Sequence, residues 1–312
     1  MSEKRDECLK TRIYIDGYNL YYGCLKRTPY KWLDLNTLFT RHILPSSSPI
    51  IDSYDDVSIK YFTADIVGKA SRSADSLTDQ QTYHRALQFS ASDGQFEIVK
   101  GYYSVNQTRA FKVNEVNPKT PPYQCEYVDI WKLEEKQTDV NIAVESLFDV
   151  MTDESLEQVV FVTNDTDLAR ALEKIRALNR VKIGLVIPTT DSVRMPNEKL
   201  DALADWTRRN ITLDELKASH LPRSVGGGRK PAVKPTTWYG APQIIEQIFE
   251  CLLPVLNNRT KCWRWLETSP PAFDDLPELS GLPITLLDDD ATADLVLLYA
   301  KRFSDISKKK NQ

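Results

Sequence analysis

Four aspartates stand where the side chains of an α/β protein could act together. Asp16 ends one short apolar run, and Asp165 and Asp167 closely follow another. Asp139 opens a segment with helical spacing. If the two apolar runs are neighbouring strands of a parallel sheet, their carboxyl ends lie at one edge, where ligands bind if the strand order reverses there. We therefore predict that these four carboxylates converge.

Such a cluster of like charges is unfavourable unless a cation lies among the carboxylates. The chain has only three histidines, far apart, and five cysteines without CxxC spacing. An all-oxygen set of ligands favours Mg²⁺ or Mn²⁺ over zinc. The metal would activate a bound water and stabilise charge on phosphorus. The predicted chemistry is hydrolysis of a phosphodiester, with all four aspartates as catalytic residues and metal ligands.

Each of these residues also has a purely structural interpretation. An aspartate that follows a strand often caps the next helix, a role that suits Asp139 and Asp165. Lys136 could touch a scissile phosphate, or could be an exposed lysine paired with a neighbouring glutamate. Tyr18 could stack an unpaired base, or could belong to the core. Asn19 could bind water or phosphate, or only form the turn after Asp16.

The first two thirds of the chain alternate strand and helix signals. Strands are predicted at 12–16, 57–65, 96–105, 126–133, 158–163 and 181–187, and helices at 79–92, 138–150, 167–178 and 197–209. Residues 106–124 contain three prolines and are predicted as a long loop. The later strands are wholly apolar, which is typical of a parallel sheet covered by helices. In the helix at 138–150, Val140, Ala143, Val144, Leu147 and Val150 form the predicted apolar stripe.

The last third differs in composition. Residues 222–237 combine three consecutive glycines, three prolines and four basic residues, which indicates a flexible basic linker. It separates a domain at 1–221 from a small helical domain at 238–312, with helices at 242–256 and 289–303. Trp263 and Trp265, near basic residues, could bind RNA or belong to a core.

Composition limits the location and the partners. The 312 residues carry a net charge of −4, so the surface as a whole does not attract nucleic acid, and a polyanion would need a local basic patch or bound cations. No apolar stretch approaches the length of a membrane helix or a signal peptide. The unpaired cysteine count favours reduced thiols. We predict a cytoplasmic protein without membrane contact.

Four segments resemble the NYN domain family, which is related to PIN-like metal-dependent nucleases. They are YIDGYNL at 14–20, EKQTDVNIAVESL at 135–147, VVFVTNDTDLARALEKIRAL at 159–178 and VKIGLVIP at 181–188. The resemblance covers about 12–211. It implies an α/β fold, a three-layer α/β/α sandwich with a central, mainly parallel sheet, and cleavage of RNA with Mg²⁺ or Mn²⁺.

The resemblance also implies roles for individual residues. Asp16, Asp139, Asp165 and Asp167 would hold the metal directly or through water, and Asn19 and Thr163 would orient water or phosphate. Two positions depart from the family pattern, because Asn164 replaces a common glycine and Glu145 a common aspartate. The longer side chain of Glu145 leaves its contact with a metal-bound water in doubt.

These observations lead to one expectation and two alternatives. We expect a divalent-metal-dependent ribonuclease, an RNA-binding hydrolase that acts on single-stranded or structured RNA. The substrate would contact Asn19, Thr163, Lys136 and Tyr18. The alternatives are a catalytically inactive NYN-type module that binds RNA or protein, and a phosphatase or nucleotidase with the same acidic site. A homo-oligomer, or a protein partner bound through the C-terminal module, is a further expectation.

Overall fold

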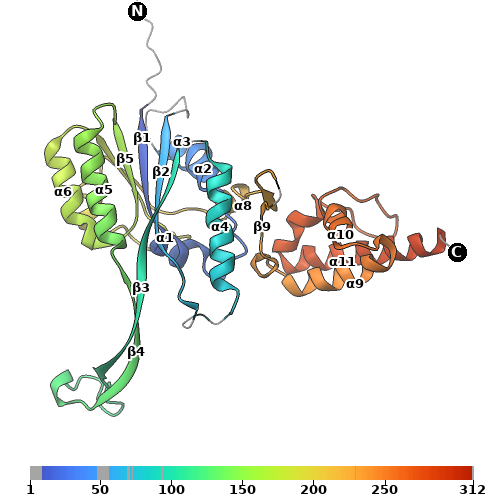
Figure 1. The fold of residues 1–312 in the computed structure, drawn as a ribbon, viewed down its shortest axis with the longest axis horizontal. Helices are drawn as coiled ribbons and strands as arrows, with labels where there is room; N and C mark the ends of the chain where they lie inside the picture. Colours follow the sequence, from blue (N-terminus) through green and yellow to red (C-terminus); the bar gives the residue numbers. More distant parts are fainter. Residues whose placement is uncertain are drawn as a thin grey trace, which may run out of the picture. The chain divides into compact units, whose positions relative to one another are not determined.

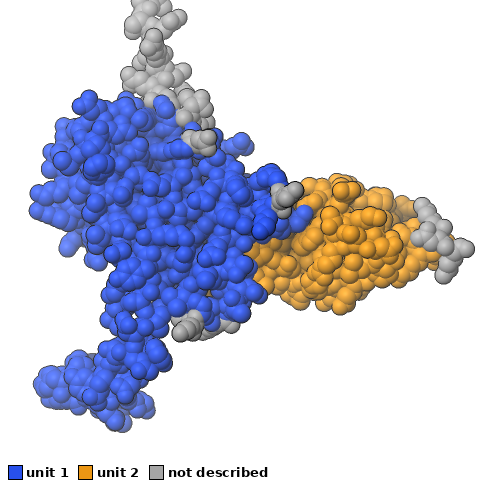
Figure 2. Space-filling model, viewed as in Figure 1, with its two compact units in different colours: residues 1–26, 33–233 blue, residues 27–32, 234–312 orange. Residues whose placement is uncertain are grey.

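The computed structural model describes residues 9–47, 56–68, 71, 73–92, 94–228 and 230–310. It contains two compact units, coloured separately in Figure 2. Unit 1 comprises Met1–Lys26 and Leu33–Val233, and unit 2 comprises Arg27–Trp32 and Lys234–Gln312.

Unit 1 is built on a seven-stranded sheet (Figure 1). Its order is β4-β3-β2-β1-β5-β6-β7, and every neighbouring pair is parallel except β3 and β4. The strands are β1 (Thr11–Asp16), β2 (Val57–Ala64), β3 (Phe96–Phe111), β4 (Tyr127–Lys136), β5 (Gln158–Val162), β6 (Lys182–Val186) and β7 (Trp206–Arg208). Strand β5 is buried along its whole length, as expected for an apolar strand with parallel neighbours on both sides. The predicted α/β class with a mostly parallel sheet is confirmed.

Helices cover both faces of this sheet. Those of unit 1 are α1 (Gly17–Leu20), α2 (Leu35–Thr37), α3 (Leu44–Ser47), α4 (Ser76–Ser90), α5 (Thr138–Thr152), α6 (Ala169–Leu178), α7 (Glu198–Asp201) and α8 (Leu213–Ala218). Short π- and 3-10 segments also occur, among them η1 (Tyr21–Leu25), η2 (Leu38–Ile43), η4 (Pro122–Gln124) and η5 (Thr166–Leu168). On β3, Val99 packs against the cluster that contains Ile142 of α5, whereas Ile98 and Lys100 face a cavity lined by α4. Because successive side chains of a strand point to opposite faces, α4 and α5 lie on opposite sides of the sheet.

Strands β3 and β4 continue beyond the sheet as a two-stranded antiparallel arm (Figure 1). Their pairing runs from Tyr102 with Lys136 to Phe111 with Tyr127. The prediction of a loop over 106–124 is therefore wrong in its first part, because residues 106–111 belong to β3. Residues 106–110 are mostly polar, so the sequence gives no strong strand signal in this part of β3.

Helix α5 turns a different face to the sheet from the one predicted. Ile142 and Val150 are buried against the sheet, but Val140 and Val144 are exposed. The predicted stripe is therefore wrong at two of its five positions. The helix has apolar residues on more than one face, so the sequence pattern alone does not show which face is inside.

Charged groups lie between α5 and the sheet. Asp149 of α5 accepts a hydrogen bond from the Tyr14 hydroxyl at 2.9 Å. Its carboxylate lies 3.1 Å from Arg12 Nη1 and 2.9 Å from Lys60 Nζ. The same Lys60 nitrogen lies 2.6 Å from Glu145 Oε2. These contacts join α5 to β1 and β2 through paired, hydrogen-bonded charges.

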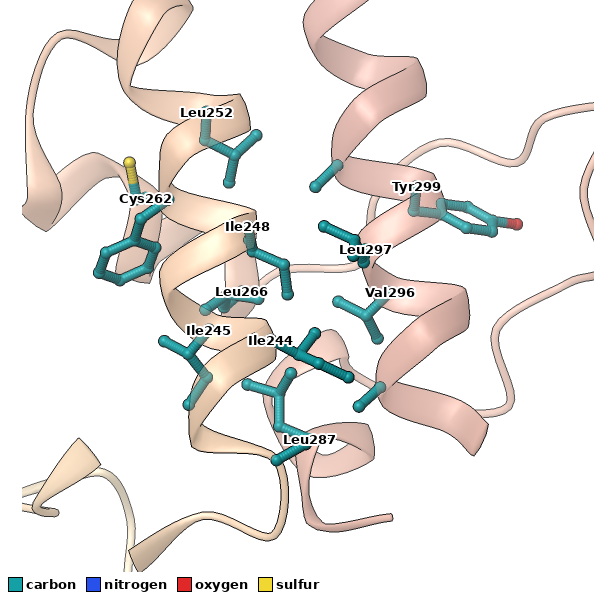
Figure 3. Packing of buried hydrophobic residues seen from close by; sticks show 14 of the residues in the cluster. Ile244, Ile245, Ile248, Leu252, Cys262, Leu266, Leu287, Val296, Leu297 and Tyr299 are labelled. Carbon is teal, nitrogen blue, oxygen red and sulfur yellow. The ribbon is translucent and has the colours of Figure 1, made fainter. Parts of the chain in front are cut away.

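Unit 2 is helical, with an apolar core shown in Figure 3. Its elements are η6 (Thr236–Trp238), α9 (Pro242–Leu256), α10 (Arg259–Leu266), η7 (Pro283–Asp288) and α11 (Asp290–Lys310). Ile244 and Ile248 of α9 point toward Val296 of α11 in this core, and Leu266 of α10 lies in the same cluster. Trp265 is buried there and Trp263 stands edge-on to Phe249 with ring centroids 5.0 Å apart. The two tryptophans thus contribute to packing.

The segment predicted as a linker carries structure of its own. Within 222–237, β8 (Ser224–Val225) pairs antiparallel with β9 (Ala232–Val233). Gly226 in the turn between them has a φ of +88°, and a Cβ at this position would lie 2.5 Å from the Phe89 ring. Among the residues that the structure describes, no helix is both long and apolar enough to cross a membrane.

Candidate active site

The candidate site lies where the strand order of the sheet reverses. Strand β1 is flanked by β2 on one side and β5 on the other, with Ile15 opposite Val162 in the parallel register. The polypeptide leaves β1 at Asp16 and β5 at Thr163, at the same edge. A cavity of about 430 Å³ opens there, a volume within the range of small-molecule sites. This is the edge at which the sequence predicted that carboxylates converge.

Asp16 is the most buried carboxylate of the cavity, with 1% of its surface exposed. It caps α1, because its Oδ1 accepts from the backbone N–H of Asn19 at 2.9 Å. Its Oδ2 accepts from the Asn19 side chain at 2.5 Å and from the Thr163 hydroxyl at 3.2 Å. Burial raises the pKa of Asp16 to about 6, although these hydrogen bonds oppose the shift. The capping interpretation and the site interpretation therefore both apply to this residue.

Asp139 differs from Asp16 because its carboxylate has no hydrogen bond or ion pair within the described part of the chain. It is the second residue of α5, it is half-buried, and it lines the cavity. Partial burial raises its pKa to about 6, and the negative charges of Asp16, Asp165 and Asp167 add to the shift. Asp139 is thus a carboxylate with an elevated pKa and free acceptor positions.

The turn that places Asp139 is tight. Gln137 has a left-handed backbone with a φ of 72°, and the Thr138 hydroxyl donates to Glu135 Oε1 at 2.5 Å. Gly101 of β3 is required beside this turn, since a Cβ there would lie 2.4 Å from the carbonyl oxygen of Lys136. The end of β4 and the start of α5 are therefore held against β3.

The other two aspartates occupy different environments. Asp165 lines the cavity, and its Oδ1 caps the short helix η5 by accepting from the backbone N–H of Asp167 at 3.0 Å. The backbone N–H of Asp165 donates to the Thr163 hydroxyl at 3.0 Å. Asp167 is exposed and does not line the cavity. The structure thus brings Asp16, Asp139 and Asp165 together and leaves Asp167 outside.

The remaining predicted residues divide in the same way. Asn19 and Tyr18 line the cavity, and Thr163 lies beneath it as a donor to Asp16. Lys136 is half-exposed, lies outside the lining and pairs with Glu134 at 3.0 Å. The structure therefore agrees with the paired-lysine alternative for Lys136.

Sequence reasoning missed several lining residues. These are Tyr103, Leu133, Glu134, Glu135, Gln137, Thr138 and Val140. The Tyr103 hydroxyl approaches Glu135 Oε2 at 3.4 Å across the β3–β4 pairing, and burial raises the pKa of Glu135. The alternation of side-chain direction along β3 and β4 could have predicted the contact between Tyr103 and Glu135 only if the antiparallel register of the two strands had been known.

Aromatic rings form the mouth of the cavity. The rings of Tyr18 and Tyr22 lie 4.3 Å apart between centroids, and both side chains are exposed. Lys26 Nζ lies 4.3 Å from the centroid of the Tyr22 ring. The cavity therefore combines ring surfaces on which a planar ligand could stack with carboxylates that could exchange protons with it.

The prediction of a Mg²⁺ or Mn²⁺ site is wrong. Among the residues that the structure describes, no group of three or more histidine, cysteine, aspartate or glutamate side chains is arranged to hold a metal ion. The carboxylate of Asp16 already accepts three hydrogen bonds from the protein, and one carboxylate oxygen of Asp165 accepts the hydrogen bond that caps η5. These oxygens already have hydrogen-bond donors within the protein. Glu145, whose contact with a metal-bound water was in doubt, binds Lys60 instead.

Comparison with known proteins changes the interpretation of these carboxylates. No protein-family model matches the chain. The chain is 44% identical over 310 residues to the 6-hydroxy-3-succinoylpyridine 3-monooxygenase HspA of Pseudomonas putida (strain DSM 28022 / S16), a match that covers 96% of both proteins. A solved structure of a protein of unknown function from Vibrio parahaemolyticus RIMD 2210633 covers 69% of this chain and 98% of its own, at 18% identity and a TM-score of 0.38.

The full-length similarity to a monooxygenase overturns the resemblance to the NYN family. The predictions of a nuclease, of RNA hydrolysis and of a metal-dependent hydrolase are therefore wrong. The two alternatives, an inactive NYN-type module and a phosphatase or nucleotidase, are wrong for the same reason. The error has a physical reason. Aspartates after parallel strands mark a ligand site in many α/β proteins, but they do not specify its chemistry, because the same carboxylates serve metal binding, proton transfer or capping.

Proposed function

The chain belongs to the family of 6-hydroxy-3-succinoylpyridine 3-monooxygenase HspA, and on this premise we propose that it is a monooxygenase acting on a hydroxylated pyridine that carries an acyl side chain. The observation that supports the proposal is 44% identity over 96% of both chains. We further propose that the substrate binds in the cavity at the carboxyl ends of β1 and β5.

The reaction named for the relative, oxygenation of a hydroxylated pyridine, would be assisted by a base near the ring hydroxyl. Positions 3 and 6 of a pyridine ring are para to each other. Loss of the proton from a 6-hydroxyl group pushes electron density onto C3, the position at which the named reaction places oxygen. Because C3 also carries the acyl group, the bond between C3 and the acyl carbon must break for the ring to become aromatic again, and addition of water to the departing acyl carbon would release it as a carboxylic acid. A carboxylate that accepts this proton as oxygen arrives would lower the barrier to attack, and general-base catalysis typically contributes about 10²- to 10⁴-fold.

Asp139 suits this role better than the other carboxylates of the cavity. Its pKa of about 6 makes it a stronger base than an ordinary aspartate while it stays largely ionised at neutral pH. Its oxygens have no donor among the described residues, whereas Asp16 accepts from Asn19 and Thr163. We assign Asp16 and Asn19 to positioning the floor of the cavity, and Tyr18 and Tyr22 to stacking the heteroaromatic ring.

A monooxygenase also takes up two electrons, and flavins are one group that carries them. The first βα turn does not fit the pyrophosphate of a dinucleotide cofactor. It reads Asp16-Gly17-Tyr18-Asn19, without the glycine-rich pattern, and it presents carboxylates where phosphate would approach. A Cβ on Gly17 would meet the Phe62 carbonyl oxygen at 2.5 Å, so this glycine serves close packing against β2.

Isotope labelling tests the proposal. The purified chain is incubated with 6-hydroxy-3-succinoylpyridine, ¹⁸O₂ and a reduced nicotinamide nucleotide as the electron source, and the product is analysed by mass spectrometry. We expect one ¹⁸O atom in the pyridine product. The same compound without the ring hydroxyl should react poorly, because it has no proton for Asp139 to accept. Absence of labelled product with any two-electron donor would overturn the proposal.

A further inference from the structure

The outer face of α5 is apolar and uncovered. Val140, Val144, Phe148 and Met151 lie three or four residues apart and are each 58–63% exposed. Residues at this spacing share one face of a helix. The opposite face of the same helix already packs against the sheet through Ile142 and Val150. A helix that is apolar on both sides is typically covered on both sides.

One face of the β3–β4 arm continues this apolar surface. Residues that pair directly across an antiparallel ribbon share a face, so Val105 with Leu133, Gln107 with Trp131, Arg109 with Asp129, and Phe111 with Tyr127 lie together. Trp131 is 69% and Tyr127 51% exposed. The other face carries the ion pairs of Glu134 with Lys132 and Lys136. The first face is therefore mainly apolar, apart from Gln107 and the ion pair of Arg109 with Asp129 at 3.6 Å, and nothing in the described residues covers its apolar side chains.

The two surfaces meet at the acidic cavity. Leu133 of the arm and Val140 of α5 both line it, so the uncovered face runs from the helix, past the cavity, onto the arm. Figure 2 shows the arm standing clear of the rest of unit 1. A lone two-stranded ribbon is at best marginally stable in water, so a partner that covers it has a structural role.

We propose that this continuous face binds a second copy of the chain in a two-fold symmetric dimer, with the arm of each copy lying along α5 of the other. The lengths agree. The six outer residue pairs of the arm span about 20 Å at the rise of a strand. The fifteen residues of α5 span about 22 Å at the rise of a helix.

Charge and area favour an identical partner. Residues 101–136 carry five basic and five acidic side chains, so the arm does not repel its copy and offers little attraction to a polyanion such as RNA. The exposed apolar surface of this face is on the order of 800 Å², contributed by Trp131, Tyr127, Phe148 and the aliphatic residues beside them. Each partner of a stable complex buries about 800 Å² of its surface. Since Leu133 and Val140 line the cavity, the second copy would also form part of its rim.

Sedimentation velocity of the full chain over a micromolar dilution series tests the dimer. We expect twice the 35.7 kDa mass of one chain at the higher concentrations. Val144→Glu should raise the dissociation constant by at least about 100-fold, because it buries an unpaired charge in the interface. Trp131→Ala on the arm should weaken the dimer independently. The matched control is Val193→Glu, the same substitution at a residue 79% exposed on the loop after β6.

The control should leave the dimer unchanged, and far-UV circular dichroism should show that all three variants are folded. A wild-type chain that sediments as a monomer throughout the series would overturn the proposal. So would a dimer whose dissociation constant is altered neither by Val144→Glu nor by Trp131→Ala. These readouts do not depend on activity, so they remain valid if the chain proves not to be a monooxygenase.

Discussion

Two groups of acidic residues in unit 1 differ in their surroundings: cations contact the carboxylates under α5, whereas among the described residues no cation contacts the aspartates of the cavity. Under α5, Asp149 contacts Arg12 at 3.1 Å and Lys60 at 2.9 Å. At the start of α5, Asp139 shares the cavity with Asp16 and Asp165 and has no cation within hydrogen-bonding distance among the described residues. The two groups lie at opposite parts of one helix, because Asp139 is in its first turn and Asp149 in its last.

The difference separates structural carboxylates from candidates for chemistry. A buried carboxylate beside a cation stays ionised and holds elements together. A partly buried carboxylate beside other carboxylates has a raised pKa, and such groups concentrate at functional sites. Asp139 and Asp16 both have a pKa raised to about 6, whereas Asp153, which accepts a hydrogen bond from the Ser155 hydroxyl and pairs with Lys10, has a pKa lowered to about 2. The cavity therefore retains an electrostatic cost that the fold could avoid by placing one lysine there.

The largest expected effect is that of Asp139→Asn on activity. Asparagine keeps the shape of the side chain but cannot accept a proton, so we expect kcat to fall by about 10²- to 10⁴-fold. Stability at neutral pH should rise, because one of several like charges is removed. Turnover and thermal denaturation of the two proteins, measured side by side, test both statements.

Asp167→Asn is the control for that experiment. Asp167 follows the same strand but is exposed and lies outside the cavity. Its variant should retain most of the turnover. If Asp167→Asn and Asp139→Asn lose activity equally, the distinction between the lining and the surface aspartates is wrong.

Asp149→Ala should have the reverse outcome. Removing this carboxylate leaves two cations and the Tyr14 hydroxyl beneath α5 with fewer acceptors, and breaking a buried ion pair from one side costs about 3–5 kcal/mol. We expect the free energy of unfolding to fall by about that amount while turnover per folded molecule changes little. Urea denaturation of the variant measures the loss. A fully stable Asp149→Ala protein would show that the paired group contributes no stability.

The two groups should also respond differently to pH. The pKa of Asp139 is raised above its value in the unfolded chain, so its ionised form destabilises the fold at pH 7. As pH falls from about 7 to 4, the folded protein binds the proton first and this penalty disappears. Asp139→Asn should therefore be more stable than the wild type at pH 7 and equal to it near pH 4. Denaturation curves across this range decide the point, and turnover should fall below about pH 6.

Much of the fold and part of the site follow from the sequence, for identifiable reasons. Apolar runs with aspartates at their ends predict strands, and the rule for parallel sheets places Asp16 and Asp165 at one edge. Tyr103 and Glu135 were missed because their contact depends on the antiparallel register of β3 and β4, which no local pattern specifies. Lys60 was missed because it lies 85 residues before Glu145, the residue that it binds. Whether a carboxylate has a structural role therefore depends on lysines and arginines that are distant in the sequence, and a local sequence pattern does not show these contacts.

Glu145→Gln gives the smallest expected effect and tests the comparison most finely. Glu145 lies at the exposed edge of the paired group, with 36% of its side chain accessible, and Lys60 keeps Asp149 as a second partner after the substitution. An ion pair so exposed to solvent contributes at most about 1 kcal/mol. We expect a loss within that limit in urea denaturation, well below the loss in Asp149→Ala, and unchanged turnover. A marked loss of turnover would instead place Glu145 in the catalytic machinery, and the division between paired and unpaired carboxylates along α5 would no longer hold.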